Sequence, residues 1–406
     1  MFSFKPWLSL FLVALIASVA VADRVIIIEK QAPAQPAPPA QPDPGQRPLI
    51  QLALLLDTSN SMDGLINQAR TQLWTIVNEL AATRRDGKVP ELQVALYQYG
   101  NDSLPITEGY IRQMVPFTTD LDVVSRELFA LTTNGGSEYC GQVIDTCVKE
   151  LDWSRRDDVY KVIFIAGNEP FTQGQTPYAE AISAARERRI VVNTIHCGGE
   201  QTGLRGMWRH GAALGGGEFF NIDQDRQIVF IKSPYDERIR ELNVELNNTY
   251  IWYGDRGREA QQNQISQDAA NAMLNKAAAM ERAKTKANSH VYKNADADLV
   301  DASQREGFKL DDVDEEALPE PMKAMNPQER EAYIKQKAQR RAEVQQEIQK
   351  LSQQRDAYVA EQRQKQAPMD EQDTLGEAVK RAARTQAEKH GFEPAAESVE
   401  SAESVE

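Results

Sequence analysis

The stretch Ile50-Gln-Leu-Ala-Leu-Leu-Leu-Asp57-Thr-Ser-Asn-Ser61 decides the fold class of this 406-residue chain. Its first seven residues are almost continuously apolar, which is typical of a strand buried on both faces of a parallel sheet. Asp57 ends the run, and residues 61–82 then repeat apolar side chains at helical spacing. The pattern predicts a buried strand, a polar loop and a helix.

Apolar runs and helical patterns continue to alternate along the next 170 residues or so. Strands are predicted at 92–99, 111–117, 159–166, 190–195 and 218–222. Helices are predicted near 120–131, 140–151 and 177–188. This alternation indicates an α/β fold with a doubly wound, mostly parallel sheet and helices on both faces. We therefore predict an α/β domain over residues 49–250.

The composition then changes, and residues 258–390 predict a mainly helical extension rich in Ala, Gln, Glu, Lys and Arg. Val344 and Ile348 belong to an apolar stripe within it, but Lys337 and Arg341 fall on the same seam. The extension is therefore only partly coiled-coil-like. A helix that docks on the α/β domain or on a partner fits this pattern better.

The N-terminus has the features of an export signal over residues 1–22. Lys5 precedes a short apolar run, and Ala20-Val-Ala22 offers small residues for cleavage before Asp23. An uncleaved signal anchor is the alternative. Both possibilities predict a periplasmic or secreted protein in a compartment that permits disulfides.

Three further segments have biased compositions. Residues 31–48 contain seven prolines and predict a semi-rigid linker. Residues 294–320 are acidic and predict a solvated face or linker. Residues 395–406 form a small acidic repeat and predict a disordered tail.

The composition also excludes several classes of protein. The formal charge is −14, from 46 basic and 60 acidic residues, so nucleic acid is not an expected partner. No long apolar run follows the signal peptide, so no further transmembrane segment is expected. The chain contains no Gly-x-Ser-x-Gly, no His-Glu-x-x-His and no phosphate-binding loop motif, which favours a protein that is not an enzyme.

The polar residues after the first strand predict a ligand site. Ligands of open parallel sheets bind beyond the carboxyl ends of the strands, where Asp57, Ser59 and Ser61 are expected. One carboxylate and two hydroxyls are hard oxygen ligands that suit Mg²⁺. The alternative is structural, since Ser59 or Asn60 could cap the following helix.

The wider pattern resembles the von Willebrand factor type A domain. The Asp-x-Ser-x-Ser sequence is followed by Gly135-Gly136-Ser137-Glu138 and later by Ala166-Gly167-Asn168 after a third strand. The resemblance covers roughly residues 49–225 and implies a metal-ion-dependent adhesion site. It implies Asp57, Ser59 and Ser61 as ligands, with Ser137 in place of the family's threonine. It also implies a protein partner, which offers a Glu or Asp to the metal.

One departure from the family bears on the metal. Gly167 stands where the third loop usually carries an aspartate, so a carboxylate is missing. Glu138 and Glu169 are near in sequence, and we take Glu138 as a candidate ligand. The resemblance then predicts a degenerate site, in which Mg²⁺ binding is weak or depends on the partner. A binding surface without metal is the other possibility.

The extension, with Leu246-Asn-Asn-Thr-Tyr250 and Asp298-Leu-Val-Asp-Ala302, looks like that of exported bacterial type A domain proteins. We therefore expect a non-enzymatic protein-binding module of the bacterial cell envelope. The alternative is a structural or assembly factor whose C-terminal helices bind the partner and whose metal site is vestigial.

The cysteines allow one disulfide prediction. Cys140 and Cys147 share a predicted helix at a separation of about 10 Å, too far for a bridge. Cys140 and Cys197 both lie near the edge that carries the ligand loops. We therefore predict a Cys140–Cys197 disulfide, with Cys147 as a buried thiol.

Overall fold

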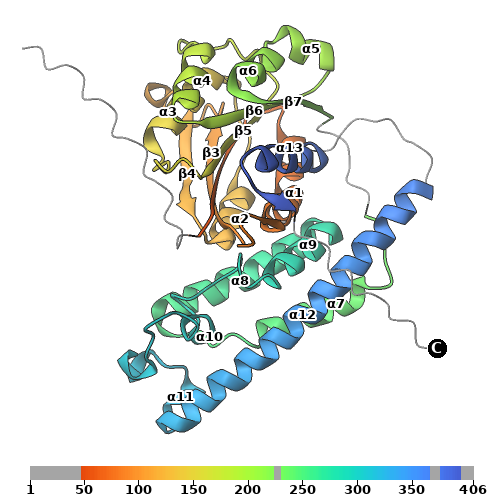
Figure 1. Cartoon of the computed structure of the whole chain (residues 1–406). Helices are drawn as coiled ribbons and strands as arrows, with labels where there is room; N and C mark the ends of the chain where they lie inside the picture. Colours follow the sequence, from red (N-terminus) through yellow and green to blue (C-terminus); the bar gives the residue numbers. More distant parts are fainter. Residues whose placement is uncertain (1–46, 224–229, 366–374, 395–406) are drawn as a thin grey trace, which may run out of the picture. The chain divides into compact units, whose positions relative to one another are not determined.

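A computed structural model describes residues 47–223, 230–365 and 375–394. Its centre is a six-stranded sheet in the order β4-β3-β1-β5-β6-β7 (Figure 1). Within this sheet β4 runs antiparallel to β3, and the other neighbouring strands are parallel. The doubly wound α/β sheet predicted from the sequence is confirmed. The strands are β1 (Leu49–Asp57), β3 (Glu91–Tyr99), β4 (Ile111–Thr118), β5 (Tyr160–Gly167), β6 (Ile190–Cys197) and β7 (Gly216–Ile222).

Both faces of the sheet are covered by helices, which explains why the strands are continuously apolar. Successive residues of a strand point to opposite faces. Leu52 and Leu54 therefore pack in a core with α1, α2 and α13, whereas Ala53 and Leu55 pack in a second core with α3, α4 and α6. These helices are α1 (Asp63–Ala81), α2 (Leu121–Ala130), α3 (Cys140–Glu150), α4 (Tyr178–Glu187), α6 (Trp208–Gly215) and α13 (Leu375–Lys389).

The predicted Cys140–Cys197 disulfide is wrong, because the sheet separates the two thiols. Cys140 belongs to the core on the α3 side, and Cys197 belongs to the core on the α1 side. All three cysteines of the chain are free and buried, including Cys147 as expected.

The last helix of the α/β core comes from the far end of the chain. Val379, Ala383 and Phe392 are at most 1% exposed and pack in the same core as α1 and β7. Directly after α13, β8 (Glu393–Pro394) pairs with β2 (Thr83–Arg84), which follows α1. The composition of residues 258–390 predicts that α13 belongs to the extension, whereas α13 completes the α/β core.

Between β7 and α13 the chain forms a mainly helical region. Its longest helix is α12 (Pro327–Lys365), which packs against α7, α9 and α10. Val344 and Ile348 of α12 share a core with Ile239 and Leu242 of α7. The other elements are α7 (Asp236–Asn247), α8 (Gly254–Leu274), α9 (Lys276–Lys286), α10 (Leu299–Ala302), α11 (Glu320–Lys323), η2 (Leu310–Asp312) and η3 (Glu315–Ala317).

Arg341, a basic residue on the seam of α12, is matched by two carboxylates. Arg341 is 3% exposed, and its Nη1 lies 2.7 Å from a carboxylate oxygen of Asp298 and 2.7 Å from one of Asp301. Its guanidinium also lies 4.0 Å from the ring centroid of Tyr250. The helix therefore packs over several short elements through an apolar and ionic seam, and not along one partner helix.

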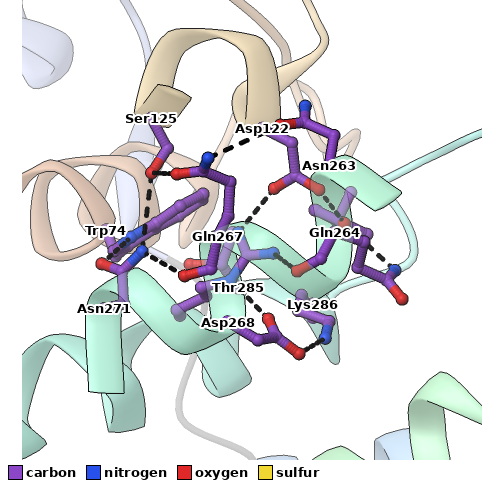
Figure 2. A network of polar contacts seen from close by, with 12 residues as sticks. Trp74, Asp122, Ser125, Asn263, Gln264, Gln267, Asp268, Asn271, Thr285 and Lys286 are labelled. Carbon is purple, nitrogen blue, oxygen red and sulfur yellow. Dashed lines mark hydrogen bonds and ion pairs between the residues drawn. The ribbon is translucent and has the colours of Figure 1, made fainter. Parts of the chain in front are cut away.

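A buried polar network joins the helical region to α1 and α2 (Figure 2). Arg282 of α9 is 2% exposed, and it contacts Asp122 of α2 at 2.5 Å and Asp268 of α8 at 2.6 Å. Trp74 of α1 donates its ring N–H to the Asn271 side chain at 2.8 Å. Because these groups are hidden from water, each depends on its partners across the interface.

Several sequence predictions lie outside the described residues. They concern the signal peptide at 1–22, the linker over 31–46 and the tail at 395–406. Among the residues that the structure does describe, no helix is long and apolar enough to cross a membrane.

Candidate functional site

Three loops meet at the edge of the sheet where β1, β3 and β5 end, which we call the carboxyl edge. The first loop (residues 58–62) follows β1, the second (131–139) precedes α3 and the third (168–177) follows β5. Backbone bonds join the first two loops, since Asn60 N–H donates to Gly135 O at 3.0 Å and Asn134 N–H to Thr58 O at 2.9 Å. The fold therefore brings together the loops that the sequence analysis singled out.

Asp57 forms the floor of this site. It is fully buried, and its Oδ1 accepts the Ser59 N–H at 2.7 Å. Its Oδ2 is buried and has no hydrogen-bond partner. The hydroxyls of Ser59 and Ser61 lie 3.5 Å apart just above it in the first loop. An oxygen that is buried without a donor is unusual and calls for a ligand or a proton.

The second loop adds a buried carboxyl group. Ser137 pairs with Gly100, which follows β3, and the next residue, Glu138, is 2% exposed. The Glu138 Oε2 accepts the backbone N–H of Glu169 in the third loop at 3.2 Å. Glu138 therefore lies at the centre of the site, although the sequence left open where its side chain would point.

The two carboxyl groups perturb each other. Burial raises the pKa of Asp57, although contacts with Glu138 and the Ser59 N–H partly oppose the shift. Burial and the nearby Asp57 raise the pKa of Glu138 still further. Without a cation, the pair therefore retains a proton well above the pH at which an exposed carboxyl group would lose it.

Gly167 ends β5, and it is surrounded by Tyr99 of β3 and by Asn168 of the third loop. A Cβ atom at Gly167 would lie 2.5 Å from the Tyr99 hydroxyl and 3.1 Å from Asp57 Oδ2. The Tyr99 hydroxyl itself donates to Ala166 O at 2.9 Å. Asn168 Nδ2 donates to the Ser61 hydroxyl at 2.8 Å, and its Oδ1 is buried without a hydrogen-bond partner.

His196 supports the third loop from β6. It is 1% exposed, with Nε2 facing Asn168 O at 3.3 Å and Nδ1 facing Asn221 Oδ1 at 2.8 Å. Both ring nitrogens therefore face amide oxygens. Through these two contacts His196 helps to hold Asn168 in position.

Sequence reasoning missed Tyr99, Asn168 and His196 as parts of the site. The signal for Tyr99 was present, because it ends the strand beside β1 and pairs in register with Asp57. For Asn168 the sequence offered only one signal, which was its position directly after Gly167. His196 pairs with Gly167 between β5 and β6, which strand register alone would have revealed.

The donors present fit a small, hard divalent cation. They are carboxylate, hydroxyl and amide oxygens, and two of the buried oxygens, on Asp57 and Asn168, lack hydrogen-bond partners. Among the described residues, no group of three or more His, Cys, Asp or Glu is placed to hold a metal ion. A cation would therefore depend on the hydroxyl and amide oxygens as well as on the carboxylates.

Comparisons with known proteins identify the α/β part. A family model of the von Willebrand factor type A domain matches residues 51–225. The solved SpRpn10 VWA domain is 13% identical, with a TM-score of 0.35 over 44% of this chain and 90% of that one. BatB from Bacteroides thetaiotaomicron is 17% identical, with a TM-score of 0.33 over 43% of this chain and 90% of that one. A comparison with curated proteins found no match.

A mussel protein gives a similar result. Proximal thread matrix protein 1 from the mussel byssus was solved with a zinc-occupied MIDAS motif, that is, a metal-ion-dependent adhesion site. It is 14% identical to this chain, with a TM-score of 0.34. The match covers 44% of this chain and 43% of the mussel protein, so this chain spans less than half of that protein's length.

The family match begins within β1 and extends past β7, so it includes all or most of each of the six strands of the sheet. The same segment contains the three loops of the carboxyl edge. Residues 51–225 of this chain belong to the von Willebrand factor type A domain family.

Proposed function

We propose that this chain binds another protein through the carboxyl edge of its sheet and uses a divalent cation to do so. Domains of this family commonly mediate protein–protein interactions through such a metal site. The observation that carries the proposal is the buried Asp57 Oδ2, which has no hydrogen-bond partner and lies among other oxygen donors. Asp57, Ser59, Ser61, Ser137 and Glu138 are the proposed ligand set.

The cation would supply a positive charge at an edge whose fixed donors are all oxygens. Mg²⁺ is the proposed ion, because it usually takes one or two protein carboxylates and keeps several waters. A Glu or Asp of the partner would replace one of these waters and complete the coordination. Burial of Asp57 prepares the site, since its side chain is already ordered before the cation or the partner arrives.

We also propose that the chain is not an enzyme. Support comes from His196, which faces two amide oxygens where a catalytic base would face a nucleophile. The proposed location is the bacterial cell envelope, either periplasmic or secreted. That location rests on the export signal that the sequence of residues 1–22 predicts.

A second candidate function places the partner on the helical region. Met273 is 87% exposed and Ile265 is 50% exposed, and both lie on α8 eight residues apart. Large apolar side chains exposed on one side of a helix are typical of a docking surface. In this alternative the helices recruit the partner, and the cation site plays no part.

Affinity capture from the native envelope with the full mature chain separates the two candidates. We expect Asp57→Ala and a chelator each to abolish capture, whereas the exposed control Glu187→Ala on α4 retains it. The paired change Ile265→Lys and Met273→Lys should also retain capture. Loss of capture in that paired variant, with full capture by Asp57→Ala, would instead establish the helical region as the binding surface.

A further inference from the structure

Glu138 is held in place from several sides. Gly100 beneath it has φ +78, and a Cβ there would lie 2.8 Å from Glu138 Cγ and 2.8 Å from Asp57 Oδ1. The two acidic side chains therefore share the space above one glycine. The Glu138 backbone N–H donates to Gln173 Oε1 at 2.8 Å, and its carboxylate accepts the Glu169 N–H at 3.2 Å. This side chain is a fixed part of the site.

No basic side chain compensates the two acids. Within residues 47–223, 230–365 and 375–394, neither Asp57 nor Glu138 forms an ion pair with lysine, arginine or histidine. Adjacent buried carboxylates are costly unless they are paired or coordinate a metal. The unpartnered Asp57 Oδ2, on a side chain with no exposed surface, is a second observation that a bound cation would explain.

The third loop has no room for the carboxylate that the family usually places there. The Tyr99 hydroxyl fills the space into which a side chain at position 167 would extend. Asn168 offers an amide oxygen close by, but an amide carries no charge. A second negative charge that this chain itself supplies must therefore come from another position.

We propose that Glu138 supplies the second carboxylate of the cation site from within the chain, in place of the one that Gly167 lacks. The inference rests on the proposed function, because it concerns the same site. When both groups are ionised, Asp57 and Glu138 carry two negative charges, which balance one divalent cation. The chain therefore binds the cation without its partner, and the site is not degenerate in charge.

The test is a calorimetric titration of the metal-free full chain with MgCl₂ and, in parallel, with MnCl₂. We expect the wild type to bind both cations, and Glu138→Gln to bind them about 10- to 100-fold more weakly. Glutamine keeps the size of the side chain and an acceptor for the Glu169 N–H. The matched control Glu169→Gln changes the neighbouring acid of the third loop and should leave the affinity unchanged.

Thermal melting supplies a second readout that a purely structural role would not produce. Without a divalent cation, Glu138→Gln should melt no lower than the wild type, because it removes one of two adjacent buried acids. With Mg²⁺ the wild type should melt higher, whereas the variant should respond much less.

The outcomes separate the inference from the proposed function. Equal Mg²⁺ affinity in the wild type and Glu138→Gln, or no cation binding by the wild type, would overturn the inference. A lower affinity in Glu169→Gln than in Glu138→Gln would overturn it in favour of Glu169. The proposed function fails separately, if Asp57→Ala still captures the partner.

Discussion

The Tyr99 hydroxyl lies where the side chain of residue 167 would begin, 2.5 Å from the position of a Cβ atom on Gly167. The strands β3 and β5 lie on either side of β1, and the Tyr99 side chain of β3 reaches past Asp57 to the end of β5. Its phenol occupies the place of the carboxylate that the family usually carries there. The loss of the acid and the presence of the tyrosine are one structural feature.

We predict that Gly167→Ala lowers the free energy of unfolding by about 1–3 kcal/mol, because the added methyl group overpacks this contact. Gly136→Ala is the matched control, since no atom lies within 4 Å of a Cβ there. Tyr99→Phe in the Gly167→Ala background should recover part of the loss. Urea unfolding measures all of these, and equal stability of the two Gly→Ala variants would contradict the packing argument.

We predict that Arg282→Met destabilises the chain by about 3–5 kcal/mol, because it leaves the buried Asp122 without its cation. The guanidinium also lies 4.8 Å from the ring centroid of Trp74, so that contact is lost as well. Adding Asp122→Asn to Arg282→Met should restore stability in part, since it removes the uncompensated charge. Chemical denaturation is the measurement.

Arg258→Met on α8 is the control for Arg282, because Arg258 forms an exposed ion pair with Asp255. Exposed pairs contribute little, so its unfolding curve should match that of the wild type. If Arg282→Met were as stable as this control, the network of Figure 2 would not hold the helical region to α1 and α2.

The stability of the chain should fall in acid partly through Asp268. Burial alone would raise the pKa of Asp268, but the charges of Lys286 and Arg282 outweigh it and hold the pKa below its usual range. The unfolded chain therefore takes up this proton first, near an ordinary pKa of about 4. The contribution of Asp268 to the free energy of unfolding is complete above about pH 5. It is lost as the pH falls through the pKa that Asp268 has in the folded protein.

The variant Asp268→Asn tests this direction of the pH dependence of stability. It should be less stable than the wild type at pH 7, and its stability should fall less steeply below pH 5. The control Asp255→Asn removes an acid that is 94% exposed on the same helix and should follow the wild-type profile. The measurement is urea unfolding at several pH values. If the stability of Asp268→Asn fell as steeply below pH 5 as that of the wild type, the assignment to Asp268 would be refuted.

The sheet and the polar loop after β1 were predictable because their signals are local. A strand covered on both faces is apolar throughout, and Asp57 ends that run within the sequence itself. Long-range pairs give no such signal. Asp298 was expected in a solvated acidic segment, whereas it is fully buried and binds Arg341, 43 residues further on.

The site was predictable in its first loop and less so elsewhere. Asp57, Ser59 and Ser61 follow one another in five residues, so their proximity needs no tertiary information. The burial of Glu138 depends on Gly100 and Glu169, which approach it from other loops. The disulfide prediction was wrong for the same reason, namely that it depends on tertiary structure. The sequence does not reveal that Cys140 and Cys197 face opposite sides of the sheet.

The C-terminal helix α13 should be essential to the α/β domain although some 150 residues separate it from β7. Ala383 is 1% exposed and Val379 is 1% exposed, and both pack in the core with α1. Gln386 strengthens this contact, since its Nε2 donates to Asn193 Oδ1 of β6 at 2.6 Å and its Oε1 accepts the Tyr160 hydroxyl at 2.9 Å. A chain that ends at residue 365 would expose this core.

We therefore predict that Ala383→Asp destabilises the α/β domain strongly, because it places an unpaired charge in an apolar core. Glu388→Ala, on the exposed side of the same helix, should leave the melting temperature unchanged. A milder variant, Phe392→Ala, removes a fully buried ring and should cost about 3–5 kcal/mol. Each is measured by thermal melting and urea unfolding of the full chain. If Ala383→Asp and Phe392→Ala melted with the wild type, α13 would not belong to the core, and the α/β domain would be complete at β7.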